Sequence, residues 1–426
     1  MADAFPNRAA ILSLQLKKLN ALLAALVPSN GFYAAKLKGR ISPISDLDDF
    51  RRNIPFTTKA EVVIDQQQVP PYGSNLTFPI DHYSRMNQTS GTAGAPLRWL
   101  DTPDTWQAMV ENWTTVFLAA GVTAEDRIYF AFSFGPFLGF WLAFEAGQRI
   151  GALCLPGGGL SSSARLRAMV DNEATVLCCT PTYALRLAEV AAHEKLPIDK
   201  TRIRKLMVAG EPGGSVPSTR ALLERLWPRA SVFDHHGMTE VGPVTYECPA
   251  QPGVLHVMEE AFIAEVIDPG SENPSPPGRP GELVLTTLDR IGSPLLRYRT
   301  GDLVHPSAAS PCTCGRFNLA LEGGIIGRTD DMVVVRGVNI FPSAIDDVLH
   351  RFGEVVEYQV RVRNSAALAD LEIAIESSLG ETQLDNLIRS LERDLQNTFS
   401  LRIPVKAVAS GSLPRFEMKA RRWIRE

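Results

Sequence analysis

Small and hydroxyl-bearing residues are concentrated in the run Thr89-Ser90-Gly91-Thr92-Ala93-Gly94-Ala95-Pro96. Its glycines allow the backbone to turn tightly, and its hydroxyl and N–H groups can then face phosphate oxygens. The run lacks the lysine of a P-loop, and an ordinary turn has a similar composition. Taken alone, the segment is consistent with a phosphate-binding loop or with a simple turn.

Two later segments offer a carboxylate at a place where it could do chemistry. Glu240 ends the run Asp234-His235-His236-Gly237-Met238-Thr239-Glu240, just after a predicted strand, where it could hold Mg²⁺ on phosphates. A lone glutamate at a strand end can equally be a satisfied structural carboxylate. Asp302 ends the run Tyr298-Arg299-Thr300-Gly301-Asp302 and could accept both hydroxyls of a ribose. An Asx-type turn would explain this aspartate as well.

Charged residues gather in two further places. The run Gly327-Arg328-Thr329-Asp330-Asp331 precedes a second set of predicted strands, and Lys419 follows Leu413-Pro414-Arg415-Phe416 near the C-terminus. Runs of charge commonly solvate a linker, and a lysine near a terminus is normally an exposed surface side chain. Each of these segments is weak by itself, so their order along the chain matters more than any one of them.

Hydrophobic periodicity predicts the elements that must position these residues. Between Asp126 and Gly237 short apolar runs alternate with helical segments, which indicates a mainly parallel sheet covered by helices, with ligands beyond the carboxyl ends of its strands. The predicted strands are 126–134, 152–156, 175–179, 205–209 and 231–235, and the predicted helices are 136–150, 161–172, 183–193 and 218–226.

The chain also contains a second predicted folding region. A Pro- and Gly-rich stretch, 269–280, precedes a strand over 281–287 that suggests a β subdomain, and from Asp331 onward the pattern restarts. The restart predicts strands 332–336, 358–363 and 371–376 and helices 344–352 and 382–399. We therefore expect an α/β fold, with a large N-terminal domain over 1–329 (mainly parallel sheets covered by helices, plus the β subdomain) and a small C-terminal α+β domain over 330–426.

The composition is that of an average globular chain. Of 426 residues, 45% are hydrophobic and 21% charged, and the net charge is -4, so neither disorder nor nucleic-acid binding is favoured. The start of the chain lacks the basic residues of a secretory signal, and no stretch approaches the length expected to span a bilayer. We expect a cytoplasmic protein without a membrane partner. Helical spacing predicts an amphipathic helix over 9–27, with Leu12, Leu16, Leu19, Leu23 and Leu26 on or near one face.

In their order and separations, the five segments resemble the adenylate-forming superfamily of acyl-CoA synthetases, adenylation domains and luciferases. The resemblance covers nearly the whole chain. The phrases Leu295-Leu296-Arg297-Tyr298-Arg299-Thr300-Gly301-Asp302 and Leu413-Pro414-Arg415-Phe416, with the length and the short N-terminal region, look closest to the phenylacetate-CoA ligase family. Members activate a carboxylic acid with ATP as an acyl adenylate and then transfer it to a thiol.

The resemblance implies a role for each segment. Thr89, Ser90, Gly91, Thr92 and Gly94 would form the loop over the β- and γ-phosphates, and Gly210, Glu211 and Pro212 would line the adenine. Asp234 and His236 belong to the segment in which Thr239 would touch the α-phosphate and Glu240 would hold Mg²⁺. Asp302 would bind the ribose, Arg328 would lie near it, Asp330 would be the hinge of the C-terminal domain, and Lys419 would be the catalytic lysine.

Two positions depart from the family pattern. His236 stands where the superfamily commonly has Tyr; an imidazole can stack on adenine, but with less area and with a titratable ring. Met418 stands where phenylacetate-CoA ligases usually have Gly. The first change puts adenine affinity in doubt, and the second could alter how the Lys419 loop packs.

Cys248, His256, Cys312 and Cys314 make a complete tetrahedral ligand set for structural Zn²⁺. Their separations match no common zinc-finger signature, so spacing alone favours unrelated buried thiols. Zinc-binding relatives of the phenylacetate-CoA ligases have cysteines and a histidine in corresponding places, and this resemblance favours zinc. We expect Cys154, Cys178 and Cys179, on predicted strands, to pack as small hydrophobes.

Aromatic residues cluster where an acid substrate should enter. Phe134 and Phe137 are interpreted as pocket walls, and Phe140 and Trp141 as core residues. The resemblance therefore predicts a ligase that joins an acid, of aromatic and phenylacetate-like type, to coenzyme A, and that forms a homodimer. The alternatives are an adenylating ligase that delivers the acyl group to a carrier protein or an amine, and a nucleotide-binding protein that has lost the chemistry.

Overall fold

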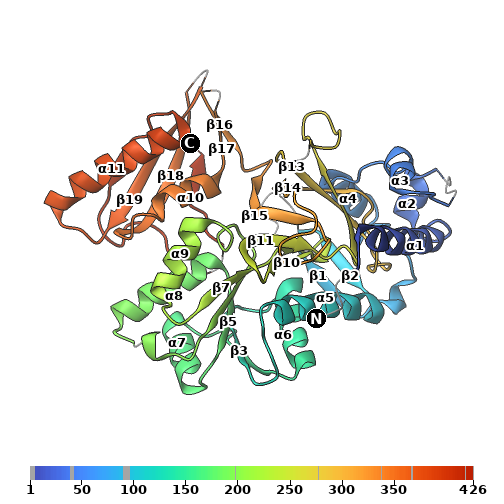
Figure 1. Cartoon of the computed structure of the whole chain (residues 1–426), viewed down its shortest axis with the longest axis horizontal. Helices are drawn as coiled ribbons and strands as arrows, with labels where there is room; N and C mark the ends of the chain where they lie inside the picture. Colours follow the sequence, from blue (N-terminus) through green and yellow to red (C-terminus); the bar gives the residue numbers. More distant parts are fainter. Residues whose placement is uncertain are drawn as a thin grey trace. The chain divides into compact units, whose positions relative to one another are not determined.

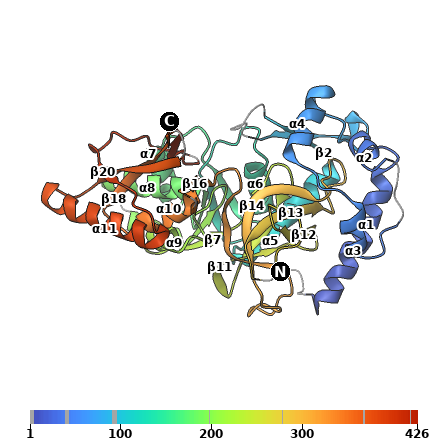
Figure 2. The same ribbon diagram turned by 90° about the horizontal axis from the view of Figure 1, so that it is seen from above.

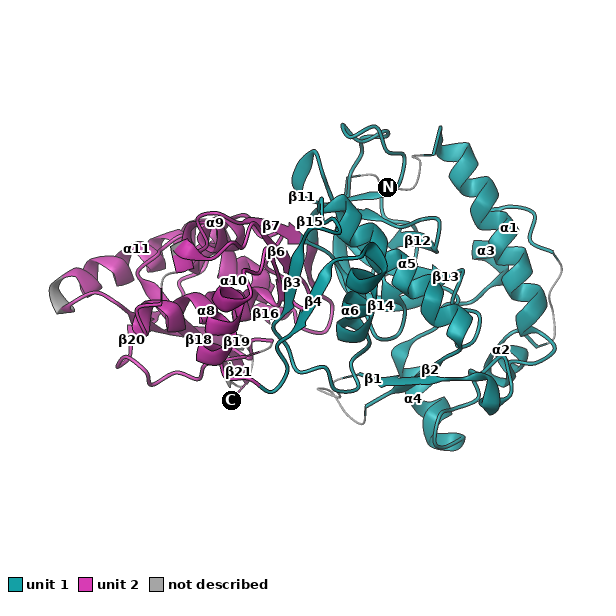
Figure 3. Ribbon diagram, turned by 90° about the horizontal axis from the view of Figure 1, so that it is seen from below, with its two compact units in different colours: residues 1–159, 234–324 teal, residues 160–233, 325–426 magenta. Residues whose placement is uncertain are grey.

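The computed structural model describes residues 5–38, 43–89, 96–196, 198–276, 278–336, 338–365, 368–417 and 419–425. The chain forms two compact units, coloured separately in Figure 3: residues 1–159 with 234–324 are unit 1, and residues 160–233 with 325–426 are unit 2. The domain boundary at 329/330 that the sequence suggests stays a prediction.

Among the described residues, unit 1 contains six α-helices, a 3₁₀-helix over Ile80–His82 and the strands of its sheets. The helices are α1 (Arg8–Leu26), α2 (Gly31–Lys36), α3 (Leu47–Asn53), α4 (Lys59–Gln68), α5 (Pro103–Ala119) and α6 (Leu138–Ile150). The shorter strands are β1 (Arg85–Gln88), β2 (Arg98–Asp101), β3 (Arg127–Phe130), β4 (Leu153–Pro156), β8 (Gly237–Met238) and β9 (Gly242–Pro243). The longer series is β10 (Thr245–Cys248), β11 (Gln251–Val257), β12 (Phe262–Ile267), β13 (Gly281–Thr287), β14 (Tyr298–Pro306) and β15 (Ala320–Arg328).

The longer strands of unit 1 form one six-stranded sheet in the order β10-β11-β15-β14-β13-β12. Strand β10 pairs antiparallel with β11, β11 with β15, β12 with β13, and β13 with β14. Gly281 begins β13, and a Cβ added there would lie 2.6 Å from the Ile267 carbonyl oxygen, so the backbone approaches too closely at this position for a larger residue. The β subdomain suggested by residues 281–287 is therefore confirmed and is larger than that single strand.

Helix α1 packs along this part of unit 1 beside α2 and α3 (Figures 1 and 2). Asn7 caps its start, and the amide of buried Gln15 donates to the carbonyl oxygens of Glu259 and Phe262. Ile11 and Gln15 lie on the buried face of the helix, whereas Leu12, which was expected on or near that face, is 37% exposed. The buried leucines of the helix are Leu19, Leu22, Leu23 and Leu26.

By length and composition α1 could cross a membrane, contrary to the expectation that no stretch is long enough. A helix that packs in the core of a globular protein passes the same test. Since the buried leucines of α1 pack with residues such as Ile263 and Leu296 in one hydrophobic cluster, the apolar face of α1 is already satisfied by protein contacts.

Unit 2 contains the remaining alternation of strands and helices. Its elements before residue 234 are α7 (Ser162–Asp171), β5 (Val176–Cys179), α8 (Pro181–His193), β6 (Lys205–Val208), α9 (Pro217–Leu226) and β7 (Ser231–Asp234). Strand β5 pairs in parallel with β6, as β3 pairs with β4 in unit 1. The predicted parallel strands and covering helices are therefore confirmed. Helix α8 begins earlier than predicted because Thr180 caps it and Pro181 suits the first turn.

The C-terminal part of unit 2 is an α+β arrangement, as predicted. It comprises β16 (Val333–Val335), β17 (Val338–Ile340), α10 (Pro342–Leu349), β18 (Val355–Ser365), β19 (Leu368–Ser377), α11 (Glu381–Phe399), β20 (Val405–Ala407) and β21 (Trp423–Arg425). A four-stranded sheet has the order β20-β19-β18-β21. Helices α10 and α11 pack on it around Ile345, Leu391 and Val360 (Figure 1).

Candidate active site

The loop that begins at Thr89 connects strands β1 and β2 of an antiparallel hairpin. The Thr89 N–H donates to the Leu97 carbonyl at 2.9 Å, and its hydroxyl accepts from the Leu97 N–H at 3.0 Å. These bonds close the base of the loop. Ser90, Gly91, Thr92 and Gly94 lie outside the described residues, so their phosphate-binding role stays a prediction.

Thr239 and Glu240 lie in the turn of a second hairpin, formed by β8 and β9. Gly242 makes this turn possible: its φ is +90°, and an added Cβ would lie 2.8 Å from the Met109 sulfur. A Cβ on Gly237 would lie 2.8 Å from the carbonyl oxygen of Gly242 across the hairpin. The glycines of this segment thus allow two strands to approach closely and present the threonine and glutamate on one tight turn.

A buried ion pair supports this turn. Arg290 donates from Nε and Nη2 to the two carboxylate oxygens of Asp101, at 2.7 and 2.6 Å. Its Nη1 donates to the carbonyl oxygens of Thr239 and Glu240, at 2.7 and 3.0 Å. Neither Arg290 nor Asp101 stands out in the sequence, and reasoning from motifs missed both. The pair fixes the backbone that carries the two candidate catalytic residues.

Lys59 is a third residue that sequence reasoning missed. Its Nζ lies 3.3 Å from Oε1 of Glu240, and the glutamate side chain is 8% exposed. Lys59 is the first residue of α4, whose start is fixed by a capping box between Thr58 and Glu61. The run Thr58-Lys59-Ala60-Glu61 has the sequence pattern of a capping box, but nothing in the sequence links that helix start to Glu240. Mg²⁺ is commonly held by one or two carboxylates together with substrate phosphates, so Glu240 fits that use.

The side chains of His236 and Asp302 are in contact in unit 1, with His236 Nε2 2.9 Å from Asp302 Oδ2. Asp302 lies within strand β14, just after Gly301, whose φ is +76°, so the alternative of an Asx-type turn does not hold. The β13–β14 register shifts nearby, between Glu282 and Val284, so a bulge rather than a turn directs this carboxylate.

Asp234 is buried at the end of β7, and its N–H donates to Oε2 of Glu247 at 3.3 Å. His235, next to it, packs edge-on against Trp113 with ring centroids 4.3 Å apart. Burial lowers the pKa of His235 to about 3, so its ring is neutral near pH 7. This part of the predicted motif is core structure around the hairpin that follows.

In unit 2 the structure brings Lys419 to the segment expected to line adenine. A Cβ added to Gly210 would lie 3.5 Å from Cε of Lys419, and the φ of this glycine is +95°. The Glu211 carboxylate accepts from the N–H groups of Thr182 and Ala420, each at 2.8 Å. Pro212 follows on an exposed turn. Met418 lies outside the described residues.

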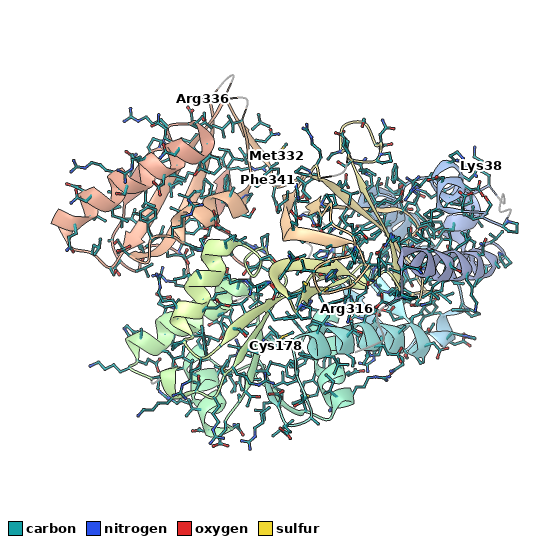
Figure 4. The ribbon with its side chains drawn as sticks, in the orientation of Figure 1. Lys38, Cys178, Arg316, Met332, Arg336 and Phe341 are labelled. Atoms are coloured by element: carbon teal, nitrogen blue, oxygen red, sulfur yellow. The ribbon has the colours of Figure 1, made fainter. Side chains whose placement is uncertain are left out.

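Arg328 and Asp330 bind each other in unit 2. Arg328 Nε donates to Asp330 Oδ1 at 2.8 Å and Nη2 donates to Oδ2 at 3.2 Å. Next to them, a Cβ on Gly327 would lie 2.7 Å from the ring of Phe341, a residue labelled in Figure 4. The ribose contact of Arg328 and the hinge role of Asp330 stay predictions.

The aromatic residues after β3 form a contiguous cluster. Phe132 is buried and stacks on Phe140, with ring centroids 4.0 Å apart. Phe134 is half-buried and contacts Trp141 at 4.9 Å between centroids. Trp141 is 38% exposed, so its interpretation as a core residue is wrong: its Nε1 donates to the Gly135 carbonyl at the surface. Phe137 is half-buried and borders Phe140.

The four predicted zinc ligands converge at the end of the six-stranded sheet. The side-chain ligand atoms of Cys248, His256, Cys312 and Cys314 all lie within 4.8 Å of one another. The Cys248 and Cys312 sulfurs are 3.8 Å apart, and the Cys314 sulfur lies 3.3 Å from His256 Nε2. Tetrahedral zinc with bonds of about 2.0 to 2.3 Å requires ligand separations of about 3.5 to 3.8 Å. The donor types therefore fit tetrahedral Zn²⁺, and separations of up to 4.8 Å are close enough to need only small side-chain shifts on binding.

The protonation of this cluster has a clear physical cause. Burial raises the pKa of the Cys248 thiol to about 12 and lowers that of His256 to about 4. At Cys312, hydrogen bonds from the Cys314 backbone and neighbouring side chains outweigh burial and lower the thiol pKa. His256 is thus neutral near pH 7, the form in which an imidazole can bind a metal. Cys178 and Cys179 are buried on β5, as expected of packing cysteines, and Cys154 is half-buried on β4.

Comparison with known proteins gives a match over nearly the whole chain. The AMP-binding enzyme family matches residues 34–287, and the AMP-binding enzyme C-terminal domain matches residues 337–426. A phenylacetate-coenzyme A ligase from Thermus thermophilus is 29% identical over 430 residues, covering 95% of this chain and 94% of the relative.

Solved structures agree with the sequence matches. A 2-hydroxyisobutyryl-CoA ligase in its postadenylation state, in complex with an acyl adenylate, superposes with a TM-score of 0.93 at 26% identity, covering 99% of this chain and 91% of that one. The same ligase in its thioesterification state, with the adenylate and CoA, gives a TM-score of 0.74 at 27% identity over the same shares. The chain therefore belongs to the AMP-binding enzyme family, within the adenylate-forming superfamily, and is phenylacetate-CoA ligase-like.

Proposed function

We propose that this chain is an AMP-forming acid–thiol ligase, which uses ATP to activate a carboxylic acid and transfers the acyl group to coenzyme A. The match over 99% of the chain to a CoA ligase that holds an acyl adenylate carries this proposal. The family match and the phenylacetate-coenzyme A ligase relative support it over the same length.

In the first half-reaction an oxygen of the acid carboxylate bonds to the α-phosphorus of ATP, and the bond from that phosphorus to the bridging oxygen of pyrophosphate breaks. Two anions must approach, so cationic groups have to neutralise the developing charge. Lys419 supplies this charge, and Thr239 donates to the α-phosphate from the hairpin turn. The loop of Thr89, Ser90, Gly91, Thr92 and Gly94 covers the leaving phosphates.

The remaining residues of the site position the nucleotide. Asp302 accepts from the ribose hydroxyls, with Arg328 near the same sugar, and the segment Gly210 to Pro212 borders the adenine. His236 stacks on the base, and its contact with Asp302 orients both side chains before ATP binds. Mg²⁺, held by Glu240, would neutralise phosphate charge when bound. Positioning and charge neutralisation together account for catalysis without a covalent enzyme nucleophile.

In the second half-reaction the coenzyme A thiolate attacks the carbonyl carbon of the adenylate, and AMP leaves. Rotation of the domain 330–426 about Asp330 withdraws Lys419 and admits the pantetheine arm, a conformational step of the kind that often limits turnover. Such a rotation requires Arg328 and Asp330 to exchange their ion pair for contacts with water, which is possible because both side chains are partly exposed.

The acid is aromatic and phenylacetate-like in this proposal. Phe134 and Phe137 form walls that would contact a flat ring, and Gly158 leaves room beside Phe134: a Cβ there would approach that ring to 3.7 Å. The alternative acceptor is a carrier protein or an amine, for which the first half-reaction would be the same. The proposal also includes structural zinc on Cys248, His256, Cys312 and Cys314, a homodimer, and a cytoplasmic location.

Acid-dependent exchange between ATP and radiolabelled pyrophosphate tests the first half-reaction directly. We expect exchange with at least one acid of a panel containing phenylacetate, benzoate, hexanoate and 2-hydroxyisobutyrate. Lys419→Ala should lower the exchange rate by about 10²- to 10³-fold, as loss of one transition-state charge contact commonly does. Lys406→Ala, which removes an exposed lysine paired with Glu372, is the matched control.

Acceptor assays then separate the alternatives. A thioester on addition of coenzyme A supports the ligase, whereas pyrophosphate release with hydroxylamine-trappable acyl groups but no thioester favours the carrier-protein or amine acceptor. Absence of exchange with every acid, in wild-type protein that binds ATP, would favour a nucleotide-binding protein without the chemistry.

A further inference from the structure

The segment that carries Lys419 is held by carboxylates on two other parts of unit 2. The Glu211 carboxylate has one oxygen on the N–H of Thr182 and the other on the N–H of Ala420, each at 2.8 Å. Thr182 belongs to the first turn of α8, so one end of this bridge is fixed to a rigid element. The other end is the residue that directly follows Lys419.

A second contact lies on the other side of the lysine. Glu189, near the end of α8, accepts from Nε of Arg415 at 2.9 Å. The remaining nitrogens of Arg415 donate to Glu376 on β19, at 2.8 and 3.1 Å. Lys419 is therefore bracketed by two carboxylates, Glu211 and Glu189, that both lie on or against α8.

The contacts of this segment fall into two groups. Those made by Arg415 with Glu376, by Arg422 with Glu357, and by β21 with β18 join parts of the C-terminal region to each other. Those made by Glu211 and Glu189 join the segment to residues 160–233. A rotation about Asp330 preserves the first group and breaks the second.

We propose that Glu211 and Glu189 are positioning residues that hold the Lys419 segment in place for the first half-reaction and release it for the second. The inference rests on the proposed function. It assigns to Glu211 a task beyond lining the adenine, because both of its side-chain oxygens are used by backbone N–H groups. Bonds between a carboxylate and N–H donors are the stronger kind of hydrogen bond, yet each can be exchanged for water when the segment leaves.

Glu211→Gln is the sharpest test because both partners of this side chain are donors. The amide has one acceptor oxygen and one donor nitrogen, so it can satisfy only one of the two N–H groups. Glu189→Gln removes the charge that binds Arg415 and leaves Glu376 in place. Glu194→Gln is the matched control: this glutamate accepts from Ser163 and Arg167 and does not contact the Lys419 segment.

The two half-reactions are measured separately in full-length protein with phenylacetate, or with the panel acid that the wild type activates fastest. Pyrophosphate exchange reports adenylation, and synthetic acyl adenylate with coenzyme A reports thioester formation. We expect Glu211→Gln and Glu189→Gln to lower adenylation by about tenfold or more relative to thioester formation, the size expected for one hydrogen bond to a charged group. The control should leave that ratio unchanged.

Amide hydrogen exchange gives a second measurement that does not depend on activity. In Glu211→Gln the peptide containing Ala420 should exchange faster, with peptides of α11 unchanged. If the variants slow both half-reactions equally, or leave their ratio and the exchange of the Ala420 peptide at wild-type values, the positioning role is wrong. If the wild type itself shows no acid-dependent pyrophosphate exchange, the proposed function fails instead.

Discussion

The guanidinium of Arg290 and the carboxylate of Asp101 bind each other at two points, 2.7 and 2.6 Å, with both side chains almost completely buried. The third nitrogen of Arg290 donates to the carbonyl oxygens of Thr239 and Glu240. A buried pair of this kind costs desolvation energy and is weak support for stability by itself. Its value here is that it fixes the hairpin turn on which the candidate catalytic residues lie.

Arg290→Lys should damage both the fold and the turn. A lysine cannot make the planar two-point contact and reach two carbonyl groups as well. We expect the free energy of unfolding to fall by about 3 to 5 kcal/mol, the usual cost of breaking a buried pair, and the adenylation rate to fall in the protein that remains folded. Denaturant unfolding and pyrophosphate exchange measure the two effects.

Arg299→Lys is the control, because this arginine on β14 pairs with Glu282 on β13 and with Glu272 in the connection before β13 but touches neither Thr239 nor Glu240. A variant at Arg290 that keeps wild-type adenylation despite the stability loss would show that the turn does not need this support.

The elements of this fold could be predicted because each has its own local signal. The strand over 281–287 was predicted to the residue, and α11 differs from its prediction by one position. The support of the site could not be predicted in this way. Asp101 and Arg290 are 189 residues apart in the chain and each is of an ordinary type, so their pairing depends on the tertiary fold and not on a local pattern.

The same contrast applies at single residues. Asp302 has the right residue type, but its placement in a strand bulge depends on a register shift with β13 that no local pattern reveals. Spacing predicts Leu12 on or near the apolar face of α1, yet Leu12 is 37% exposed, while Gln15 is buried and its amide donates to the Glu259 carbonyl oxygen. Hydrogen bonds and strand pairings between residues far apart in the sequence determine which side chains of an element are buried and where a carboxylate is placed.

Metal analysis tests the cluster of Cys248, His256, Cys312 and Cys314. Protein purified without chelator should contain about one zinc per chain, because three thiols and a neutral imidazole form a complete tetrahedral set. Cys312→Ser should lose the metal and lower the melting temperature, while pyrophosphate exchange at low temperature persists, since the cluster would be structural.

Cys154→Ser is the control for loss of a thiol, because Cys154 lies on β4 and outside the cluster. Metal-free protein with full thermal stability, or a Cys312 variant that retains zinc, would contradict the assignment.

Acid selectivity should change when the wall at Phe134 is removed. Phe134→Ala enlarges the space beside Gly158, so kcat/KM for phenylacetate should fall by about tenfold or more relative to that for hexanoate, the size expected when a few methylene equivalents of contact are lost. Gly158→Ala should narrow the same space, and the fold should tolerate it because the nearest atom to the added Cβ is 3.5 Å away.

Gly139→Ala is the control for a glycine change nearby, since its Cβ would meet nothing within 4 Å. An unchanged ratio of kcat/KM values in both Phe134→Ala and Gly158→Ala would place the acid elsewhere.

The free energy of unfolding should depend on pH through Asp346, whose carboxyl group accepts a hydrogen bond from the Tyr358 hydroxyl. Burial, opposed by Arg422 and reinforced by nearby carboxylates, raises the pKa of Asp346 from 3.8 to about 7. A carboxyl whose pKa is raised by folding contributes stability that is complete below pH 3.8 and is lost as the pH rises through 7. The amide of Asp346→Asn does not titrate, so this variant should gain about 1 to 3 kcal/mol relative to wild type between pH 4 and pH 8.

Asp347→Asn, on the same helix, should lose stability relative to wild type as the pH rises, which is the opposite of the change expected for Asp346→Asn. Although burial opposes the change, hydrogen bonds from Arg351 and Ser218 lower the pKa of Asp347, so its stabilisation is present above pH 3.8 and is lost as the pH falls below it. Urea unfolding of wild type and both variants across this range measures the two differences. Parallel curves for wild type and Asp346→Asn would mean that the Asp346 carboxyl is not protonated in the folded protein near neutral pH.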